Sequence, residues 1–399
     1  MSLKRLKSGR VRSSFIYGPA PKRLISLALI LALLTFIHAA AQAADTGSAA
    51  TEVGTLPETT INADSGTSSN LLITDGRGQE VKLPGLPQRI LITGKASFMV
   101  LDAVYLFPDI RAKIVGKGKD GQGMDAFLSA IDPEYPNKTS LGREPSPEQI
   151  AACKPDVVLM KKASAETLGR SLESLGIPVV CVDFETPEQY DRDLAILGRL
   201  LGQEARAKTL GDLIHTRLNL IADALAGLDE TKKPRVLLLY YDPQNGSVSF
   251  NVPPTAWMQT LLVKMAGGRP LWEGTQLGQG WTKTGFEQIA AWDADQIFIV
   301  SYFANPDKVV ADLKADEHWQ ALRAVKNGNL LAFPGDLLSW DQPDPRWVLG
   351  LTWLAARMHP ELFRGLDMHA EVSRFFKDFY GVDDSIIDKI IRPALYGNL

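Results

Sequence analysis

A repeated five-residue segment constrains the fold of this chain more than any other feature of its sequence. Glu-Gln-Ile-Ala-Ala occurs at 148–152 and again at 287–291. In each copy an aspartate stands eight residues after the glutamate, and a run rich in apolar residues follows it. This pattern is typical of a short helix that leads into a buried strand. The repeat therefore predicts two similar α/β lobes, one around each copy.

A single long helix is predicted between the two copies. The stretch 204–225 contains no proline, and its composition favours helix. Its apolar residues recur at three and four positions, which places one stripe of them along a helix. The stripe consists of Leu210, Leu213, Ile214, Leu218, Ile221 and Leu225. At 1.5 Å per residue the helix would be roughly 33 Å long, a suitable length for a span between two lobes.

Strands and helices are expected to alternate on both sides of this helix, which implies mostly parallel sheets covered on both faces. In the first lobe we expect a hairpin over 71–83, strands at 89–92, 114–116, 157–160 and 179–182, and helices at 98–107, 124–131, 165–175 and 187–201. In the second lobe we expect strands at 236–241, 248–251, 296–300 and 330–333, and helices at 257–266, 306–313, 345–358 and 369–379.

The N-terminal segment is predicted to be a signal peptide. Seven basic residues precede an apolar run at 24–37, and Ala41-Gln42-Ala43 fits the small-x-small cleavage pattern. We expect cleavage near Ala43 and a periplasmic location. The first cysteine is Cys153, so no lipoprotein anchor is expected. The predicted division is therefore signal peptide 1–43, flexible leader 44–68, first lobe 69–201, interlobe helix 202–229, and second lobe with closing helices 230–399.

The charge of the mature chain argues against binding to nucleic acid. Of the 43 basic residues, seven lie in the signal segment, which leaves 36 against 46 acidic residues, a net charge of −10. Binding to a phosphate backbone needs clustered bases. The only two cysteines, Cys153 and Cys181, are interpreted as buried thiols, although an exported protein also permits a disulfide between them.

No pattern in the sequence indicates catalysis or a resident metal. Gly-x-Ser-x-Gly, His-Glu-x-x-His and a phosphate-binding loop of the Gly-x4-Gly-Lys-Ser/Thr type are all absent. The mature chain has only four histidines, His215, His318, His359 and His369, in contexts that suggest helix faces and turns. We therefore expect no catalytic residue, no metal ligand and no cofactor. An exported enzyme and a binder of bare zinc or manganese remain minor alternatives.

Several segments over 71–399 together resemble the substrate-binding proteins of bacterial ABC importers for ferric siderophores, haem and cobalamin. The resemblance rests on Arg89-Ile90, 146–158, Gly176-Ile177-Pro178-Val179-Val180, Trp319-Gln320-Ala321-Leu322, Val325-Lys326-Asn327-Gly328 and 345–355. It implies the helical-backbone type of periplasmic binding protein, a monomer that captures a small metal chelate between two lobes. It also implies delivery to a membrane permease that works with an ATPase.

The same resemblance assigns a role to the repeated glutamates. In that family one glutamate on each lobe docks onto basic residues of the permease, and the matching positions here are Glu148 and Glu287. The alternative interpretation is that each glutamate lies in the first turn of a helix and offsets the helix dipole. Docking pairs of this kind would set register and encounter rate more than affinity.

Ligand residues are expected in loops beyond the carboxyl ends of the strands. Cations there suit an anionic chelate or an oxyanion, and aromatic rings suit an aromatic or macrocyclic ligand. The candidates are Lys95, Arg143, Tyr241, Trp257, Trp281, Lys283, Tyr302, Trp340 and Arg346. Trp281 resembles a ligand-stacking position of cobalamin binders, whereas Gly142 stands at the corresponding first-lobe position. The preferred ligand is a ferric siderophore; molybdate, tungstate or cobalamin is the alternative.

Overall fold

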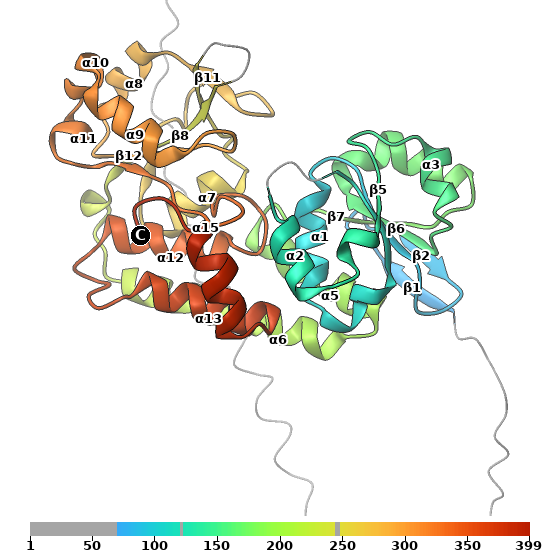
Figure 1. Cartoon of the computed structure of the whole chain (residues 1–399). Helices are drawn as coiled ribbons and strands as arrows, with labels where there is room; N and C mark the ends of the chain where they lie inside the picture. The colour runs from blue at the N-terminus through green and yellow to red at the C-terminus, as the bar shows by residue number, and fades with distance from the viewer. Residues whose placement is uncertain (1–69, 120–122, 244–247) are drawn as a thin grey trace, which may run out of the picture. The chain divides into compact units, whose positions relative to one another are not determined.

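The computed structural model describes residues 70–119, 123–243 and 248–399. The predicted signal peptide and flexible leader lie outside the described residues. Within the described residues two larger sheets form, one of five strands and one of six, together with a small two-stranded sheet (Figure 1). The two copies of the repeat feed strands of different sheets, as the prediction of two lobes requires.

The first lobe is built on a parallel sheet with strand order β5-β4-β3-β6-β7. A π-helical turn at Ala165–Gly169 begins the helix expected at 165–175. The strands are β1 (Leu71–Thr74), β2 (Glu80–Leu83), β3 (Ile90–Ile92), β4 (Ile114–Lys117), β5 (Thr139–Ser140), β6 (Val157–Lys161) and β7 (Val179–Val182). The helices are α1 (Ser97–Tyr105), α2 (Asp125–Ile131), α3 (Pro147–Ala152), α4 (Arg170–Ser174) and α5 (Pro187–Leu201).

The second lobe repeats part of this order in a mixed sheet, β11-β9-β8-β12-β13, with β10 paired to β8. β8, β12 and β13 are parallel, whereas β9 runs antiparallel to both β8 and β11. The strands are β8 (Arg235–Asp242), β9 (Ser249–Val252), β10 (Arg269–Pro270), β11 (Thr282–Thr284), β12 (Gln296–Val300) and β13 (Leu330–Ala332). The helices are α7 (Met258–Met265), α8 (Phe286–Trp292), α9 (Pro306–Ala315), α10 (Glu317–Gln320), α11 (Arg323–Lys326), α12 (Trp347–Met358), α13 (Met368–Tyr380), α14 (Asp384–Ile386) and α15 (Arg392–Ala394).

The long helix α6 (Glu204–Leu225) has the bounds that its apolar periodicity predicts. It packs against α5 of the first lobe and α12 of the second. Arg206, near its start, donates to the carbonyl of Leu106 after α1 and to the carbonyl of Phe379 in α13. One side chain therefore joins the ends of helices from both lobes, and α6 acts as a structural connector.

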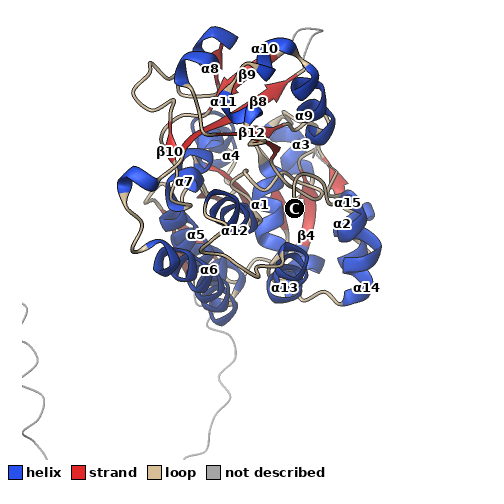
Figure 2. Ribbon diagram, turned by 90° about the vertical axis from the view of Figure 1, so that its left-hand side faces the viewer, coloured by secondary structure: helices blue, strands red, loops and turns tan. Residues whose placement is uncertain are grey.

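The closing helix α13 contributes to the junction between the lobes. Its Phe376 and Tyr380 pack edge-on against Phe127 of α2, with ring centroids 5.4 and 5.1 Å apart. The ring of Tyr190 in α5 of the first lobe packs against that of Trp347 at the start of α12, with centroids 5.6 Å apart. These buried rings make the junction a continuous core. In the view of Figure 2, helices flank the strands of each lobe.

A segment near residue 397 covers the free edge of β13. The Asn398 side chain accepts a hydrogen bond from the backbone of Ala332, and its own backbone N–H donates to the Ala332 carbonyl. Trp353 Nε1 donates to the Asn398 carbonyl at 2.6 Å. Gly397 donates to the Asp307 side chain. The edge strand of this sheet is therefore occupied within its own chain.

Two further findings concern predictions from the sequence. Cys153 and Cys181 are free thiols, so they are not paired in this structure. Cys181 is buried as expected, and burial raises the pKa of its thiol to about 12, whereas Cys153 is partly exposed. Among the helices in the described part of the chain, none combines the length and the apolar character needed to cross a membrane.

Candidate functional site

A pocket at the carboxyl ends of the first-lobe strands is the strongest candidate for a ligand site. Its volume is about 300 Å³. Its first-lobe wall consists of 94–98 after β3, Lys119 after β4, and Arg143 with Glu144 before α3. Phe303, from the loop after β12 of the second lobe, lines the same pocket. The pocket thus lies where ligands of open α/β sheets are expected, and both lobes contribute to it.

Three exposed cations dominate the charge of this pocket. Lys95, Lys119 and Arg143 all line it, and Glu144 is its single acidic lining residue. Within the described ranges, none of the three cations forms an ion pair with another residue. The structure therefore brings the predicted Lys95 and Arg143 together. An anion entering the pocket would meet donors that are not already neutralised.

The loop that carries Lys95 is held in an uncommon backbone conformation. Gly94 has a φ of 97°, and a Cβ at that position would lie 2.7 Å from the Ser164 hydroxyl oxygen. The same hydroxyl accepts a hydrogen bond of 2.9 Å from the Lys95 backbone. Ala96 has a φ of 51° and begins α1 without a side-chain cap. No side chain therefore caps the first-turn N–H groups beside the pocket, although the Met99 N–H donates to the Ala96 carbonyl.

Two buried lysines lie at the ends of neighbouring strands in the same lobe. Lys117, at the end of β4, is 3.1 Å from the Asp125 carboxylate and 3.5 Å from the centre of the Tyr135 ring. Burial alone would raise the pKa of Asp125, but hydrogen bonds from Tyr135 and Lys117 outweigh it and lower that pKa. Lys161, at the end of β6, pairs with Glu185. Both lysines are compensated, so the uncompensated positive charge lies on the loops.

The second lobe carries a cluster of aromatic rings, none of which lines the pocket that contains Lys95 and Arg143. Tyr240 is stacked on Tyr302, with ring centroids 4.7 Å apart. The ring centroid of Trp281 lies 4.9 Å from that of Tyr240 and 5.7 Å from that of Trp257. The Tyr302 hydroxyl donates to Asp341 at 2.7 Å. The predicted Trp257, Trp281 and Tyr302 therefore form one cluster. Trp257 and Trp281 remain partly exposed, which leaves ring surface for a ligand.

Two other predicted ligand residues lie apart from this pocket. Tyr241 packs against Phe250 with ring centroids 5.8 Å apart. Lys283 is exposed on β11, where its Cα pairs with that of Asn251. Neither residue lines the pocket that contains Lys95 and Arg143.

The structure corrects the expectation of ligand contact for Trp340 and Arg346, because both side chains are completely buried. Trp340 Nε1 donates to Asp336 at 3.0 Å. Arg346 pairs with Asp102 of α1 and with Asp336, and Asp344 Oδ1 lies 3.8 Å away. Burial is the first influence on the pKa of Asp102 and of Asp344, and it raises both. Arg346 thus joins the lobes internally, with no surface for a ligand.

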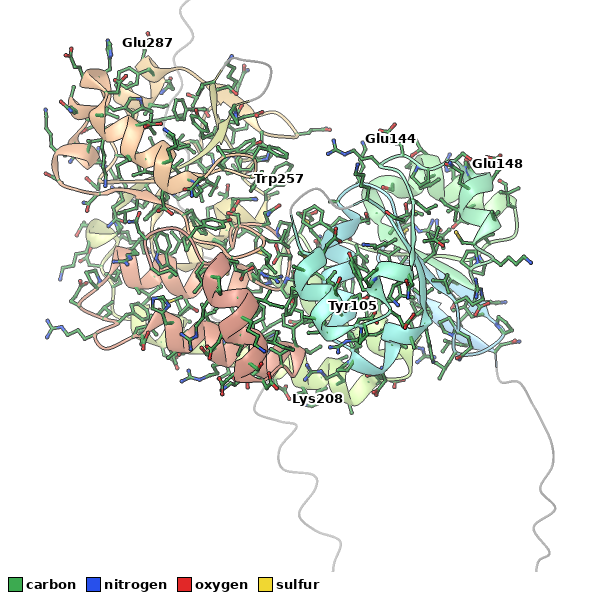
Figure 3. All side chains as sticks on the ribbon, in the orientation of Figure 1. Tyr105, Glu144, Glu148, Lys208, Trp257 and Glu287 are labelled. Carbon is green, nitrogen blue, oxygen red and sulfur yellow. The ribbon has the colours of Figure 1, made fainter. Side chains whose placement is uncertain are left out.

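Glu148 and Glu287 occupy corresponding positions, each in the first turn of a short helix. Both are exposed, and neither pairs with a base elsewhere in the described residues. Hydrogen bonding to Ser146 lowers the pKa of Glu148, so its carboxylate is charged at neutral pH. Figure 3 shows both side chains at the outer surface of their own lobes. Two unpaired carboxylates on matched helices are available to a partner.

No group of three or more His, Cys, Asp or Glu side chains in ranges 70–119, 123–243 and 248–399 is arranged to hold a metal ion.

Comparison with known proteins decides the family. The family model described as periplasmic binding protein matches residues 109–337, more than half of the chain. The chain belongs to the periplasmic binding protein family. It is therefore a binding protein of the kind that serves ABC transporters.

Three proteins similar to this chain are binding proteins, and one of them has its ligand in its name. The molybdate-binding protein MolA of Haemophilus influenzae is 23% identical over 254 residues, 58% of this chain and 69% of MolA. The structure of MolA bound to molybdate has a TM-score of 0.65 and 19% identity, covering 78% of this chain and 98% of MolA. A periplasmic solute-binding protein from Veillonella parvula has a TM-score of 0.66 and 24% identity, covering 81% and 97%. FepB of the same organism has a TM-score of 0.63 and 19% identity, covering 77% and 96%.

Several pocket residues were not among the site residues predicted for this periplasmic binding protein. Lys119, Glu144 and Phe303 all lie in loops that follow strands or precede the repeated helix, and these loops are visible in the sequence. The missing information was which residue of each loop faces the others. Phe303 gives no such signal in the sequence, because its exposure of 54% is visible only in the structure.

Proposed function

We propose that this periplasmic binding protein captures an anionic metal chelate, of the ferric siderophore type, and delivers it to an ABC permease. The observation that supports this proposal is the pocket lined by Lys95, Lys119 and Arg143 on one lobe and by Phe303 on the other. Unpaired cations favour a ligand of negative charge, and a guanidinium suits bidentate contact with carboxylate or catecholate oxygens.

The aromatic cluster of the second lobe supplies the complementary contact. A chelate exposes organic carbon around its metal, and partly exposed indole rings offer broad, weakly polar surface to it. Trp257 and Trp281 lie on one lobe, and the cations lie on the other. The proposed ligand is therefore recognised through charge on one side and through ring contact on the other.

Delivery is proposed to depend on Glu148 and Glu287. Both carboxylates are exposed and unpaired within the described structure, and they stand on matched helices of the two lobes. A permease with basic residues at two matching positions would contact both lobes at the same time. The protein is proposed to act as a monomer in the periplasm after removal of its signal peptide, and an ATPase would drive the permease.

An inorganic oxyanion such as molybdate or tungstate is the second candidate ligand. The uncapped start of α1 and the Ser97 hydroxyl lie in the same pocket as Arg143. Neutral N–H and O–H donors of this kind bind oxyanions well. MolA, a molybdate-binding protein, is a relative of this chain.

Titration calorimetry of the purified mature protein tests the proposal. The probes are ferric citrate, a ferric tris-catecholate, haem, cobalamin and molybdate. Arg143→Glu is expected to lower the affinity for the anionic chelate by at least about tenfold, because it replaces an attractive charge with a repulsive one. Arg170→Glu is the control, since Arg170 is exposed and lies outside the pocket.

Equal affinity of wild type and Arg143→Glu for every anionic probe would contradict the proposed site. Tight binding of molybdate with no response to either iron chelate would replace the first candidate with the second. For delivery, the Glu148→Ala, Glu287→Ala double variant is expected to lose uptake in cells while keeping its ligand affinity.

A further inference from the structure

A second groove adjoins the candidate pocket, and its volume is about 570 Å³. It lies between the loop before α3 and the helix that starts at Ala165. The pocket and the groove share Gly94, Lys95, Arg143 and Glu144. A ligand held by the shared cations would therefore have room on two sides.

The new groove differs in chemistry from the pocket. Its helix wall carries three hydroxyls, Ser164, Thr167 and Ser171, and Leu168 lies between them. Pro145 and Pro147 form the opposite wall. The Thr167 side chain is exposed, and no other described residue bonds to its hydroxyl. The groove thus offers polar donors and acceptors beside apolar surface, without acidic residues other than Glu144.

The position of the charges indicates how the two spaces would be used. Lys95 and Arg143 stand at the boundary, where both spaces meet. The charged centre of a ligand belongs at this boundary, and Phe303 faces it only from the pocket side. Whatever extends from the centre into the groove meets hydroxyls. Together the two spaces exceed what a tetrahedral oxyanion fills and lie within the range of roughly 300–1,000 Å³ for pockets that bind organic molecules.

We propose that this groove is a second ligand subsite, which holds a polar, hydroxyl- or amide-bearing arm of a metal chelate whose anionic centre lies between Lys95 and Arg143. The inference rests on the proposed function and narrows its ligand class. The natural ligand would then be an extended chelate with an arm of several bonds. Compact chelates and inorganic oxyanions are disfavoured as natural ligands.

Filling the groove provides the test. Ser171→Phe places a large ring in it, and Ser174→Phe is the matched control. Ser174 is an exposed serine on the same helix whose hydroxyl, like that of Ser171, donates to the carbonyl four residues earlier, and it does not line the groove. Thr167→Val is a milder variant that removes a hydroxyl with little change of shape. Circular dichroism of all three variants checks that they fold.

The probes are a linear ferric tris-catecholate with a polar arm, ferric citrate and molybdate, measured by titration calorimetry. Ser171→Phe is expected to lower the affinity for the chelate with the polar arm by about tenfold or more, because the arm and the ring compete for one space. Thr167→Val is expected to lower this affinity by about threefold, the size of one modest hydrogen bond. Ferric citrate should change by less than about twofold in every variant, as should all probes with Ser174→Phe.

Each other result counts against the subsite. Equal loss for the chelate with the polar arm and for ferric citrate would show a general disturbance of the pocket. Unchanged affinities with lost uptake in cells would assign the groove to permease docking. A wild type that binds molybdate or ferric citrate but not the chelate with the polar arm would overturn the subsite and leave anion capture standing. A wild type that binds none of the three probes would overturn both the subsite and the proposed function.

Discussion

The two copies of the repeat share a scaffold but differ in what stands around it. Six residues after the glutamate, Lys154 and Asp293 both adopt a left-handed backbone with a φ of 48°. Eight residues after it, Asp156 and Asp295 each accept hydrogen bonds from backbone N–H groups at the start of the neighbouring strand. The same left-handed turn, which few residues other than glycine favour, therefore occurs at the matching position in both lobes.

The differences lie on either side of this shared turn. Ser146 and Gln149 form a reciprocal cap on α3, whereas Gly285 gives α8 no side-chain cap. Before the helix, the second lobe has Trp281 and the strand β11, whereas the first lobe has Gly142 at the position matching Trp281 and Arg143 beside it. The comparison teaches that the helix-turn-strand unit is the common framework. Charge and aromatic surface are carried by the segments before it, where the ligand is proposed to bind.

The largest expected effect is at the contact where the two lobes meet. Arg346→Met removes the guanidinium that compensates Asp102 from the first lobe and Asp336 from the second. Because buried carboxylates are left without a cation, we expect a loss of about 3–5 kcal/mol in the free energy of unfolding. Urea denaturation measures it. Arg323→Met, which breaks only pairs that water reaches, should cost less than about 1 kcal/mol. Equal losses would show that the contact does not join the lobes.

The same cluster predicts a dependence on pH. Burial raises the pKa of Asp102 and of Asp344 in the folded state. A carboxyl whose folded pKa is raised stabilises the fold most below its unfolded pKa, and this contribution is lost as the pH rises through the folded pKa. Asp344→Asn cannot titrate, so its stability relative to wild type should improve from acidic to neutral pH. Thermal melts across that range check it, and a parallel pH profile of both proteins would contradict it.

Removing the carboxylate after each copy of the repeat is expected to cause a loss of intermediate size in the free energy of unfolding. Because the two carboxylates occupy matching positions, the two losses compare the lobes directly. Asp156 is exposed, so its removal leaves two backbone N–H groups that water can reach, and Asp156→Ala should cost about 1 kcal/mol. Asp295 is partly buried and also pairs with Arg235 and Arg323. Asp295→Ala should therefore cost about 2 kcal/mol. Asp312→Ala, in an exposed helical pair, is the control, and a reversed order would reject the argument from exposure.

The smallest effect concerns the left-handed residues. Lys154→Gly relieves an unfavourable backbone conformation and should stabilise the protein by about 0.5 kcal/mol, since glycine adopts it freely. Asp293→Gly gains the same relief but loses the pairs with Arg235 and Arg323, so no net gain is expected. Lys154→Ala keeps the strain and serves as the control. A gain for both glycine variants would show that the pairs of Asp293 contribute nothing.

Much of the fold was predictable because its periodic patterns are local. The bounds of α5, α6 and β12 agree with the apolar patterns over 187–201, 204–225 and 296–300. The short strands β5, β10 and β11 were missed, because two or three residues carry no periodic signal. The predicted domain limits, the ligand residues and the docking roles remain predictions.

The site was harder to predict because its contacts are distant in sequence. Lys95 and Arg143 were identified from their places after β3 and before α3, and they share one pocket. Arg346 looked like a solvent-facing cation in a loop, but its partner Asp102 lies 244 positions away. Trp340 was misplaced for a different reason, since the Asp336 that holds its indole is only four positions away but gives no signal of burial in the sequence.

The segment that covers β13 has a consequence for the behaviour of many molecules together. An open edge strand is a template on which another chain can add by backbone pairing, and such addition begins fibrils. Here Asn398 already satisfies both backbone groups of Ala332. Neighbouring copies in a crowded compartment would find these two groups already bonded, which disfavours the addition of another strand at this position.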